Sequence, residues 1–156
     1  MSGIRAKNTA PERLVRSELH QLGFRFRLHV RELPGTPDIV LPRWNTAILV
    51  HGCFWHGHGC RLFRLPATRT QFWEDKIKRN LEVDKRTVAS LKQLGWRVLV
   101  IYECALRGPE RRSMTAFRNR INRWIVSPRT FGEIRGTRSV IRRKERNLRS
   151  EKMSND

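Results

Sequence analysis

The chain has 156 residues, 38% of them hydrophobic and 30% charged, which suits one domain with a modest core under a heavily charged surface. Lysine and arginine total 33 against 14 aspartate and glutamate, and a formal charge of +19 argues against an enzyme of small metabolites, because such self-repulsion costs stability. Nucleic acid is the favoured partner; an anionic membrane surface is the alternative, although no basic helix with a clean apolar face is evident.

The sequence carries no sign of membrane insertion or secretion. No stretch approaches the roughly 18 apolar residues of a membrane span. The amino-terminal residues MSGIRAKNTAPER lack the apolar region of a signal peptide. Two of the three cysteines cluster with histidines, which favours a metal site in a reducing compartment over a disulfide framework. We therefore expect a cytoplasmic protein.

The first part of the chain predicts one helix and three strands. A helix is expected over residues 9–23, because Thr9 is a good N-cap, Glu12 lies three positions after it and Gly23 is a good helix stop. The three strands are expected over residues 24–30, 38–41 and 46–50. The last of these is a continuous apolar run, which is typical of a central strand.

The second part of the chain predicts two helices with a strand between them. They are expected over residues 70–95, 96–102 and 109–125. Together the elements predict an α/β fold with a mixed central sheet flanked by helices. From about residue 128 the chain carries arginine and lysine with few apolar residues. We therefore expect a folded domain over residues 1–127 and a mobile basic tail over residues 128–156.

The segment HGCFWHGHGC, residues 51–60, places metal-binding side chains close together. Cys53, His58 and Cys60 fall within eight residues, and Cys104 follows the strand predicted over 96–102. If that strand pairs with 46–50, both following loops leave one edge of the sheet, and Cys104 can complete a tetrahedral Cys₃His site. Thiolates with an imidazole select zinc, and a site closed by four protein ligands is structural. The alternative is a set of buried free cysteines with exposed histidines.

Asp38 is the candidate ligand for a catalytic cation. It lies at the start of one predicted strand, while the next strand runs directly into His51. A carboxylate in that position can hold magnesium, which polarises a scissile phosphate. The nuclease pattern PD…(D/E)xK fails here, because Leu49, Val50 and His51 stand where the second carboxylate and lysine are required. Histidines can replace them as base and acid. The alternative for Asp38 is a residue that only ends a turn.

Two further features have both a functional and a structural interpretation. Phe54, Trp55 and Trp73 are either core residues or aromatics that a rigid loop wedges between base pairs. The adjacent pair Phe54 and Trp55 would point in opposite directions on an extended stretch, so one core would hold only one of them easily. Glu12 is either a catalytic carboxylate or the partner of Thr9 in a capping box.

With these residues in view, the chain resembles the very short patch repair (Vsr) mismatch endonucleases, a divergent branch of the restriction-endonuclease-like nucleases. The resemblance spans roughly residues 4–108 and is carried by the segments IRAKNTAPERLVRSELHQLGFRF, LPGTPDIV, HGCFWHGHGC, FRLPATRTQFWEDKI and LGWRVLVIYECALRG. It implies a restriction-endonuclease-like fold and a magnesium-dependent enzyme that nicks duplex DNA 5′ to the thymine of a T:G mismatch. Such mismatches arise when 5-methylcytosine deaminates.

The resemblance also implies a role for each candidate residue. Asp38 and the main-chain carbonyl of Val50 would hold magnesium. His56 would be the general base, oriented by Asp84. The remaining assignments are His51 and Glu12 in the active site, Cys53, His58, Cys60 and Cys104 on structural zinc, and Phe54, Trp55 and Trp73 as aromatics that bind DNA by intercalation.

Two departures from the family pattern and two rival functions remain. Val50 stands where some members carry threonine, and Gly57 and Gly59 replace histidines that are not ligands in this assignment. The amino-terminal arm is expected to be very short. The implied protein is a monomer near the bacterial nucleoid, linked in function to a cytosine-5 methyltransferase and mismatch-repair proteins. The rivals are a non-catalytic zinc-braced DNA-binding protein and a related nuclease with another lesion or site specificity.

Overall fold

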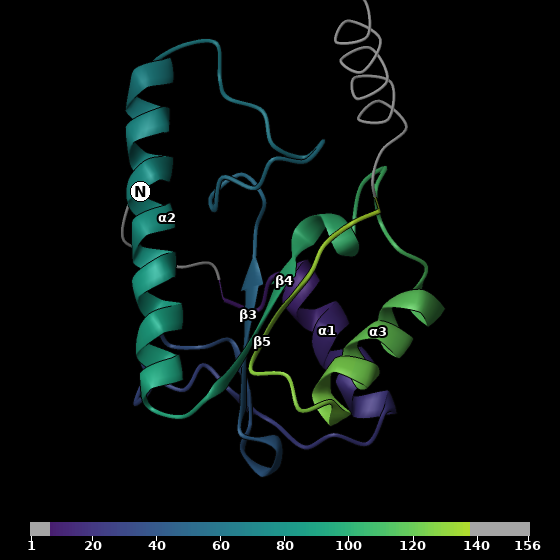
Figure 1. Cartoon of the computed structure of the whole chain (residues 1–156). Helices are drawn as coiled ribbons and strands as arrows, with labels where there is room; N and C mark the ends of the chain where they lie inside the picture. The colour runs from purple at the N-terminus through teal and green to yellow at the C-terminus, as the bar shows by residue number, and fades with distance from the viewer. Residues whose placement is uncertain (1–6, 138–156) are drawn as a thin grey trace, which may run out of the picture.

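The computed structural model describes residues 7–137, which form three layers: helix α2 covers one face of a five-stranded sheet, and helices α1 and α3 cover the other (Figure 1). The elements in chain order are α1 (Ala10–Gln21), β1 (Arg27–Leu28), β2 (Ile39–Leu41), the 3-10 helix η1 (Pro42–Trp44), β3 (Thr46–His51), α2 (Thr70–Gln93), β4 (Arg97–Tyr102), the 3-10 helix η2 (Glu103–Ala105), α3 (Met114–Val126) and β5 (Phe131–Ile134). The predicted α/β class is confirmed.

The sheet is mixed, as predicted, and its strands follow the order β1-β2-β3-β4-β5. The pairs β1–β2 and β2–β3 are antiparallel, whereas β3–β4 and β4–β5 are parallel. In the register of β3 and β4, His51 lies opposite Tyr102. The loops after these two strands therefore leave the same edge of the sheet, which is the geometry that the predicted Cys₃His site requires.

The two faces of the sheet bury separate apolar clusters. On the α2 face, Leu91 and Val88 pack against alternate residues of the central strands: Ala47, Leu49, Val98 and Val100. On the other face, buried residues of α1 and α3 pack against the sheet: Val15, Leu19, Phe117, Ile121, Trp124 and Ile125. The period-two alternation of β3 and β4 divides their side chains between these clusters, because successive residues of a strand point to opposite faces.

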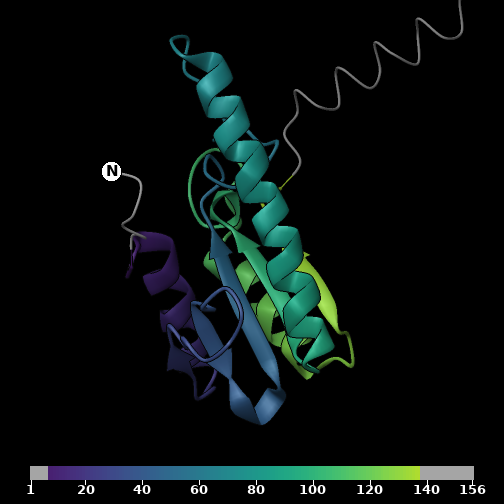
Figure 2. The same cartoon turned by 90° about the vertical axis from the view of Figure 1, so that its left-hand side faces the viewer.

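Helix α2 has 24 residues, and its amino-terminal half projects beyond the edge of the sheet where β3 and β4 end (Figures 1 and 2). The loop between β3 and α2 lies beside this projecting half. Gly57 of the loop has a positive φ of 58°, and a Cβ atom there would meet Ile77 Cγ2 of α2 at 2.8 Å. Glycine therefore allows both the turn and the close approach to the helix. Across residues 7–137, no helix is long and apolar enough to cross a lipid bilayer.

Two predictions about strands need correction. The first strand, predicted over residues 24–30, is only Arg27–Leu28, since Phe24 and Phe26 pack on the core outside the ladder and His29 has a positive φ of 47°. Strand β5, Phe131–Ile134, falls in the segment predicted as a tail, so that assignment is wrong for these residues. The remaining tail, residues 138–156, lies outside the described residues.

Strand β5 is held in place by a basic side chain that the composition alone would assign to DNA. The Arg97 guanidinium donates to the carbonyls of Trp124, Ser127 and Arg129, at 3.1, 2.6 and 2.8 Å. It also lies over the Trp124 ring, 4.6 Å from the centroid. Burial lowers the pKa of Arg97. This arginine closes the carboxyl end of α3 onto the sheet, where the last helical carbonyls have no intrahelical partner.

Candidate functional site

Three groups of metal-ligating side chains occur among the described residues, and the carboxyl end of β3 links them. Within each group the ligand atoms lie within 4.8 Å of one another. The groups are Cys53, His58, Cys60 and Cys104; His51, His56 and Asp84; and Glu12, His29 and Asp38. The first two include residues at the end of β3 or in the loop after it, and the third is joined to β3 because Val50 N donates to Asp38 Oδ2 at 2.7 Å.

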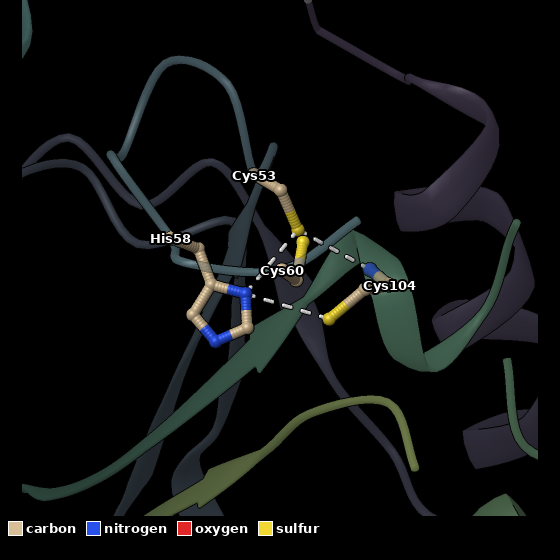
Figure 3. A group of neighbouring side chains, drawn as sticks. All are labelled: Cys53, His58, Cys60 and Cys104. Carbon is tan, nitrogen blue, oxygen red and sulfur yellow. Dashed lines mark hydrogen bonds between the residues drawn. The ribbon is translucent and has the colours of Figure 1, made fainter. Parts of the chain in front are cut away.

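The Cys/His cluster brings together all three cysteines of the chain and one histidine (Figure 3). Cys104 belongs to η2, directly after β4, and the other members lie in the loop after β3. His58 Nδ1 is 3.6 Å from Cys53 Sγ and 3.5 Å from Cys104 Sγ. The predicted proximity of these four residues is confirmed, and the cluster could hold a metal ion.

The surroundings of the cluster favour the thiolate form of Cys104 over that of Cys53. A hydrogen bond from the Cys53 thiol, with help from His58 and the Gly136 amide, lowers the pKa of Cys104 to about 4. The same hydrogen bond, together with burial, raises the pKa of Cys53. Amide groups approach two of the sulfur atoms: Cys104 N donates to Cys53 Sγ and Gly136 N to Cys104 Sγ, both at 3.3 Å. Such N–H donors stabilise thiolates in metal sites.

The acidic group gathers side chains from three separate elements: Glu12 from α1, His29 from the turn after β1, and Asp38 from the start of β2. Glu12 is only 3% exposed, although it carries a carboxylate close to that of Asp38. Two carboxylates at this separation repel each other, and burial increases the cost unless a cation lies between them. The donor set therefore fits a divalent cation.

Glu12 takes part in the N-terminal cap of α1, and its carboxylate lies in the acidic group. Its backbone amide donates to Thr9 Oγ1 at 3.4 Å, which is the N-cap bond that the sequence predicts. Its carboxylate instead accepts from Asn8 N at 3.1 Å and from Arg16 Nη2 at 3.2 Å. The hydrogen bonds to Asn8 and Thr9 at the start of α1 therefore help to hold the Glu12 carboxylate in the acidic group.

His51, His56 and Asp84 form the second group, and its geometry suits proton transfer. Asp84 Oδ2 lies 2.6 Å from His56 Nδ1, so the carboxylate accepts from Nδ1–H and leaves a lone pair on Nε2. The rings of His51 and His56 are stacked, with centroids 3.7 Å apart and planes 2° from parallel. Lone pairs in parallel stacked rings point side by side, not to a common point, which disfavours one shared metal ion. Asp84 lies on α2.

The aromatic residues form a cluster beside these groups in which Trp55 is exposed and Phe54 and Trp73 are partly buried. Ring centroids of Phe54, Trp55 and Trp73 lie 5.1–5.9 Å apart in edge-to-face contacts. Trp55 is 47% exposed, so the core interpretation is wrong for this side chain. Lys76 Nζ lies 5.3 Å from the Trp55 centroid and 5.7 Å from that of Trp73. A basic, aromatic surface of this kind suits stacking on bases next to phosphates.

A cavity of about 420 Å³ opens next to the second group, between α2 and strands β3, β4 and β5. Its lining includes His51, Asp84 and Tyr102, and also Lys85 and Lys92 of α2. Tyr102 also stacks on His58, with centroids 3.9 Å apart, and meets His51 edge-to-face at 5.9 Å. Burial raises the pKa of Tyr102 to about 12, so its hydroxyl stays protonated near neutrality.

Sequence reasoning missed several residues of this region. His29 and Arg16 join the acidic group, Tyr102 links two groups, and Lys76 lies over the aromatics. The available signal for Tyr102 was its position two residues before Cys104. For His29 it was a histidine just before the turn that leads to Asp38. No pattern in the sequence connects Arg16 to His29 or to Asp38.

Comparisons with known proteins show which proteins this chain is similar to. The family profile described as DNA mismatch endonuclease Vsr matches residues 1–62. The DNA mismatch endonuclease Vsr of Escherichia coli is 46% identical over 134 residues, covering 86% of each chain. The type II nicking enzyme V.XorIIP of Xanthomonas oryzae is 54% identical over 106 residues, covering 68% of this chain and 78% of its own. V.NmeAIP of Neisseria meningitidis is 39% identical over 125 residues, 80% of this chain and 86% of its own.

This chain is a mixed α/β domain with a carboxylate group and a His–Asp pair. It is 46–54% identical to enzymes named as a DNA mismatch endonuclease and a nicking enzyme, so it is an endonuclease. The similarity to the Escherichia coli enzyme extends over most of both chains. The chain belongs to the Vsr family of DNA mismatch endonucleases.

Proposed function

We propose that this endonuclease nicks one strand of duplex DNA 5′ to the thymine of a T:G mismatch and depends on a divalent cation, magnesium, held at Asp38. The main support for the proposal is that the candidate cation ligand and the candidate base meet at the end of β3. Val50 N of this strand bonds Asp38, and the next residue, His51, stacks on His56, which contacts Asp84. Several relatives are named as nicking enzymes and one as a mismatch endonuclease, which supports single-strand cleavage at a mismatch.

The carboxylates of Asp38 and Glu12 and the main-chain carbonyl of Val50 are the oxygen atoms that we assign to the cation. Oxygen ligands of this kind suit magnesium, which usually binds one or two carboxylates and keeps several waters. When bound, the cation would polarise the scissile phosphate and stabilise charge on the leaving oxygen. The Val50 side chain packs against the core, so its replacement of threonine leaves the main-chain carbonyl in place.

His56 is the general base in this proposal. Asp84 holds the proton on Nδ1, so Nε2 can accept a proton from water. The water oxygen then forms a bond to phosphorus while the bond from phosphorus to the 3′-oxygen breaks. A 5′-phosphate remains on the thymine, and the 3′-oxygen of the preceding nucleotide takes a proton from solvent water to become a hydroxyl. His51, stacked on His56, is assigned to the charge that builds on the phosphate.

The aromatic cluster supplies the selectivity for a mismatch. Phe54, Trp55 and Trp73 are assigned to insertion into the base stack next to the T:G pair, where unstacking costs less than in a matched duplex. Asn80 Nδ2 donates to the Trp55 carbonyl at 3.0 Å and ties this loop to α2. The wedge is therefore presented by a braced loop and not by a free one.

Zinc is the metal that we assign to the Cys/His cluster. Tetrahedral zinc with bonds of about 2.3 Å to sulfur and about 2.0 Å to nitrogen has sulfur–nitrogen edges of about 3.6 Å. The distances of 3.6 and 3.5 Å from His58 Nδ1 to two sulfur atoms match those edges. With four protein ligands the site is closed, so zinc would brace the loop that carries His56 and the aromatics.

The remaining parts of the proposal concern context. The three-layer arrangement around a mixed sheet supports a restriction-endonuclease-like fold. The formal charge of +19 supports binding of a DNA duplex by a monomer. Repair of deaminated 5-methylcytosine would link the enzyme to a cytosine-5 methyltransferase and to mismatch-repair proteins.

The deciding experiment compares nicking of otherwise identical duplexes that carry T:G, another mismatch or a matched pair, with magnesium present. We expect a nick 5′ to the thymine in the T:G duplex only. Equal cleavage of all duplexes would favour a nuclease of other specificity. Salt-sensitive binding without any nicked product, under every divalent cation tried, would favour a non-catalytic DNA-binding protein.

A further inference from the structure

His29 lies at the point where the two carboxylates of the acidic group meet. Its Nε2 atom is 3.8 Å from Glu12 Oε2, and the ligand atoms of Glu12, His29 and Asp38 lie within 4.8 Å of one another. The side chain is 18% exposed and comes from the turn between β1 and β2. His29 N donates to the Asp38 carbonyl at 3.1 Å, so the backbones of these two residues are also held together.

The hydrogen bonds of Arg16 show which ring nitrogen of His29 carries the lone pair. Arg16 Nη2 lies 3.2 Å from His29 Nε2 and 3.2 Å from Glu12 Oε2. A guanidinium group can only donate, so a hydrogen bond between these atoms requires that Nε2 accepts and that the proton of the neutral ring lies on Nδ1. A metal ion also requires an unprotonated Nε2, and on binding it would take the lone pair that Arg16 uses in its absence.

We propose that His29 is a nitrogen ligand of the divalent cation held by Asp38 and Glu12, and that it makes this site favour Mn²⁺ over Mg²⁺. Magnesium prefers oxygen ligands, whereas first-row transition ions accept imidazole. Two carboxylates and one imidazole leave the rest of the coordination sphere for water and phosphate. The inference rests on the proposed function, because it assumes that the catalytic cation binds at Asp38.

A purely structural explanation competes with this one. His29 would then serve only to accept the hydrogen bond of Arg16 and to neutralise Glu12. Substitution by glutamine separates the two roles, because a glutamine oxygen still accepts from Arg16 but offers no nitrogen lone pair to a cation. His20, an exposed histidine on α1, provides a matched control.

The experiment uses the full chain with its zinc site filled and titrates Mn²⁺ by electron paramagnetic resonance and Mg²⁺ by calorimetry. Loss of a group outside the ligand shell can weaken metal binding 10- to 100-fold. We therefore expect His29→Gln to weaken Mn²⁺ binding by about tenfold or more and to leave Mg²⁺ binding within about threefold. Pulsed measurements should show coupling of bound Mn²⁺ to a ¹⁴N nucleus in the wild type and in His20→Gln, but not in His29→Gln.

The outcomes separate this inference from the proposed function. If His29→Gln keeps both the ¹⁴N coupling and the Mn²⁺ affinity, or if the wild type has no such coupling, His29 is not a ligand. Asp38→Asn tests the underlying site: it should weaken binding of both ions. Unchanged binding of both ions in Asp38→Asn would instead overturn the cation site itself, whatever the result for His29.

Discussion

The Cys/His cluster and the acidic group lie near the same strand end, yet they are built in opposite ways. The cluster offers four side chains from two loops that follow adjacent parallel strands, so a tetrahedral ion bound there would have all four positions filled by protein. The acidic group takes Glu12, His29 and Asp38 from three elements and supplies fewer ligands than a six-coordinate ion requires. A closed site can only brace the fold, whereas an open site can admit water and a phosphate.

This difference predicts that changes in the two groups affect different measurements. A ligand lost from the open site should reduce cleavage and leave the fold nearly intact. A ligand lost from the closed site should reduce stability first, and cleavage only as a consequence. The following substitutions test this separation from the largest expected effect to the smallest.

Asp38→Ala should have the largest effect on activity. Electrophilic assistance by a metal ion is worth several kcal/mol, so cleavage of the T:G duplex should fall on the order of 1000-fold or more. The lost hydrogen bond from Val50 N should lower the free energy of unfolding by only about 1 kcal/mol. Nicking rates and denaturant unfolding measure the two effects, and DNA binding should persist. Undiminished cleavage would show that the open site is elsewhere.

His56→Ala should reduce nicking about 100- to 10,000-fold, which is the usual contribution of a general base. Asp84→Asn should act in the same direction, because the amide NH₂ can favour the wrong tautomer of His56 and a neutral amide does not stabilise the imidazolium that forms. His20→Ala, an exposed position on α1, is the control. Single-turnover nicking with saturating DNA isolates the chemical step. Equal single-turnover rates in wild type and His56→Ala would remove His56 from the chemistry.

Cys104→Ala should act on stability before activity. Loss of one ligand should release zinc and lower the free energy of unfolding by on the order of 3 kcal/mol. A strong chelator should lower the melting temperature of the wild type toward that of the variant and leave the variant itself unchanged. Metal analysis and thermal unfolding provide the readouts. A variant that still binds one zinc ion and melts like the wild type would contradict the closed-site assignment.

Trp55→Ala should have the smallest effect. Stacking on one base contributes about 1–3 kcal/mol, so binding to a T:G duplex should weaken by roughly 5- to 150-fold. Binding to a matched duplex should change less, because it offers no weakly stacked step. Leu94→Ala, at the opposite end of α2 and 60% exposed, should leave both affinities unchanged. Titration with fluorescent duplexes measures the ratio. An unchanged ratio would place Trp55 outside the wedge.

Local patterns predicted most elements because their signals act over a few residues. Thr9 caps α1, the apolar runs of β3 and β4 are central strands, and α2 begins at Thr70 as expected. The failures occur where tertiary contacts outweigh local preference. Strand β5 forms beside β4. Arg97 donates to the carbonyls of Ser127 and Arg129, which lie just before β5. Neither interaction leaves a periodic trace in the sequence.

The residues of the candidate site also differ in whether local sequence or tertiary packing brings them together. The sequence by itself determined that Cys53, His58 and Cys60 lie together, because eight residues of chain cannot separate them far. It also placed Cys104 close by, since parallel pairing of two apolar strands brings their following loops to one edge. Only the tertiary structure decided that His29 and Arg16 meet Glu12 and Asp38. These residues come from three elements, and their distances depend on how α1 packs across the sheet, a property of the whole core.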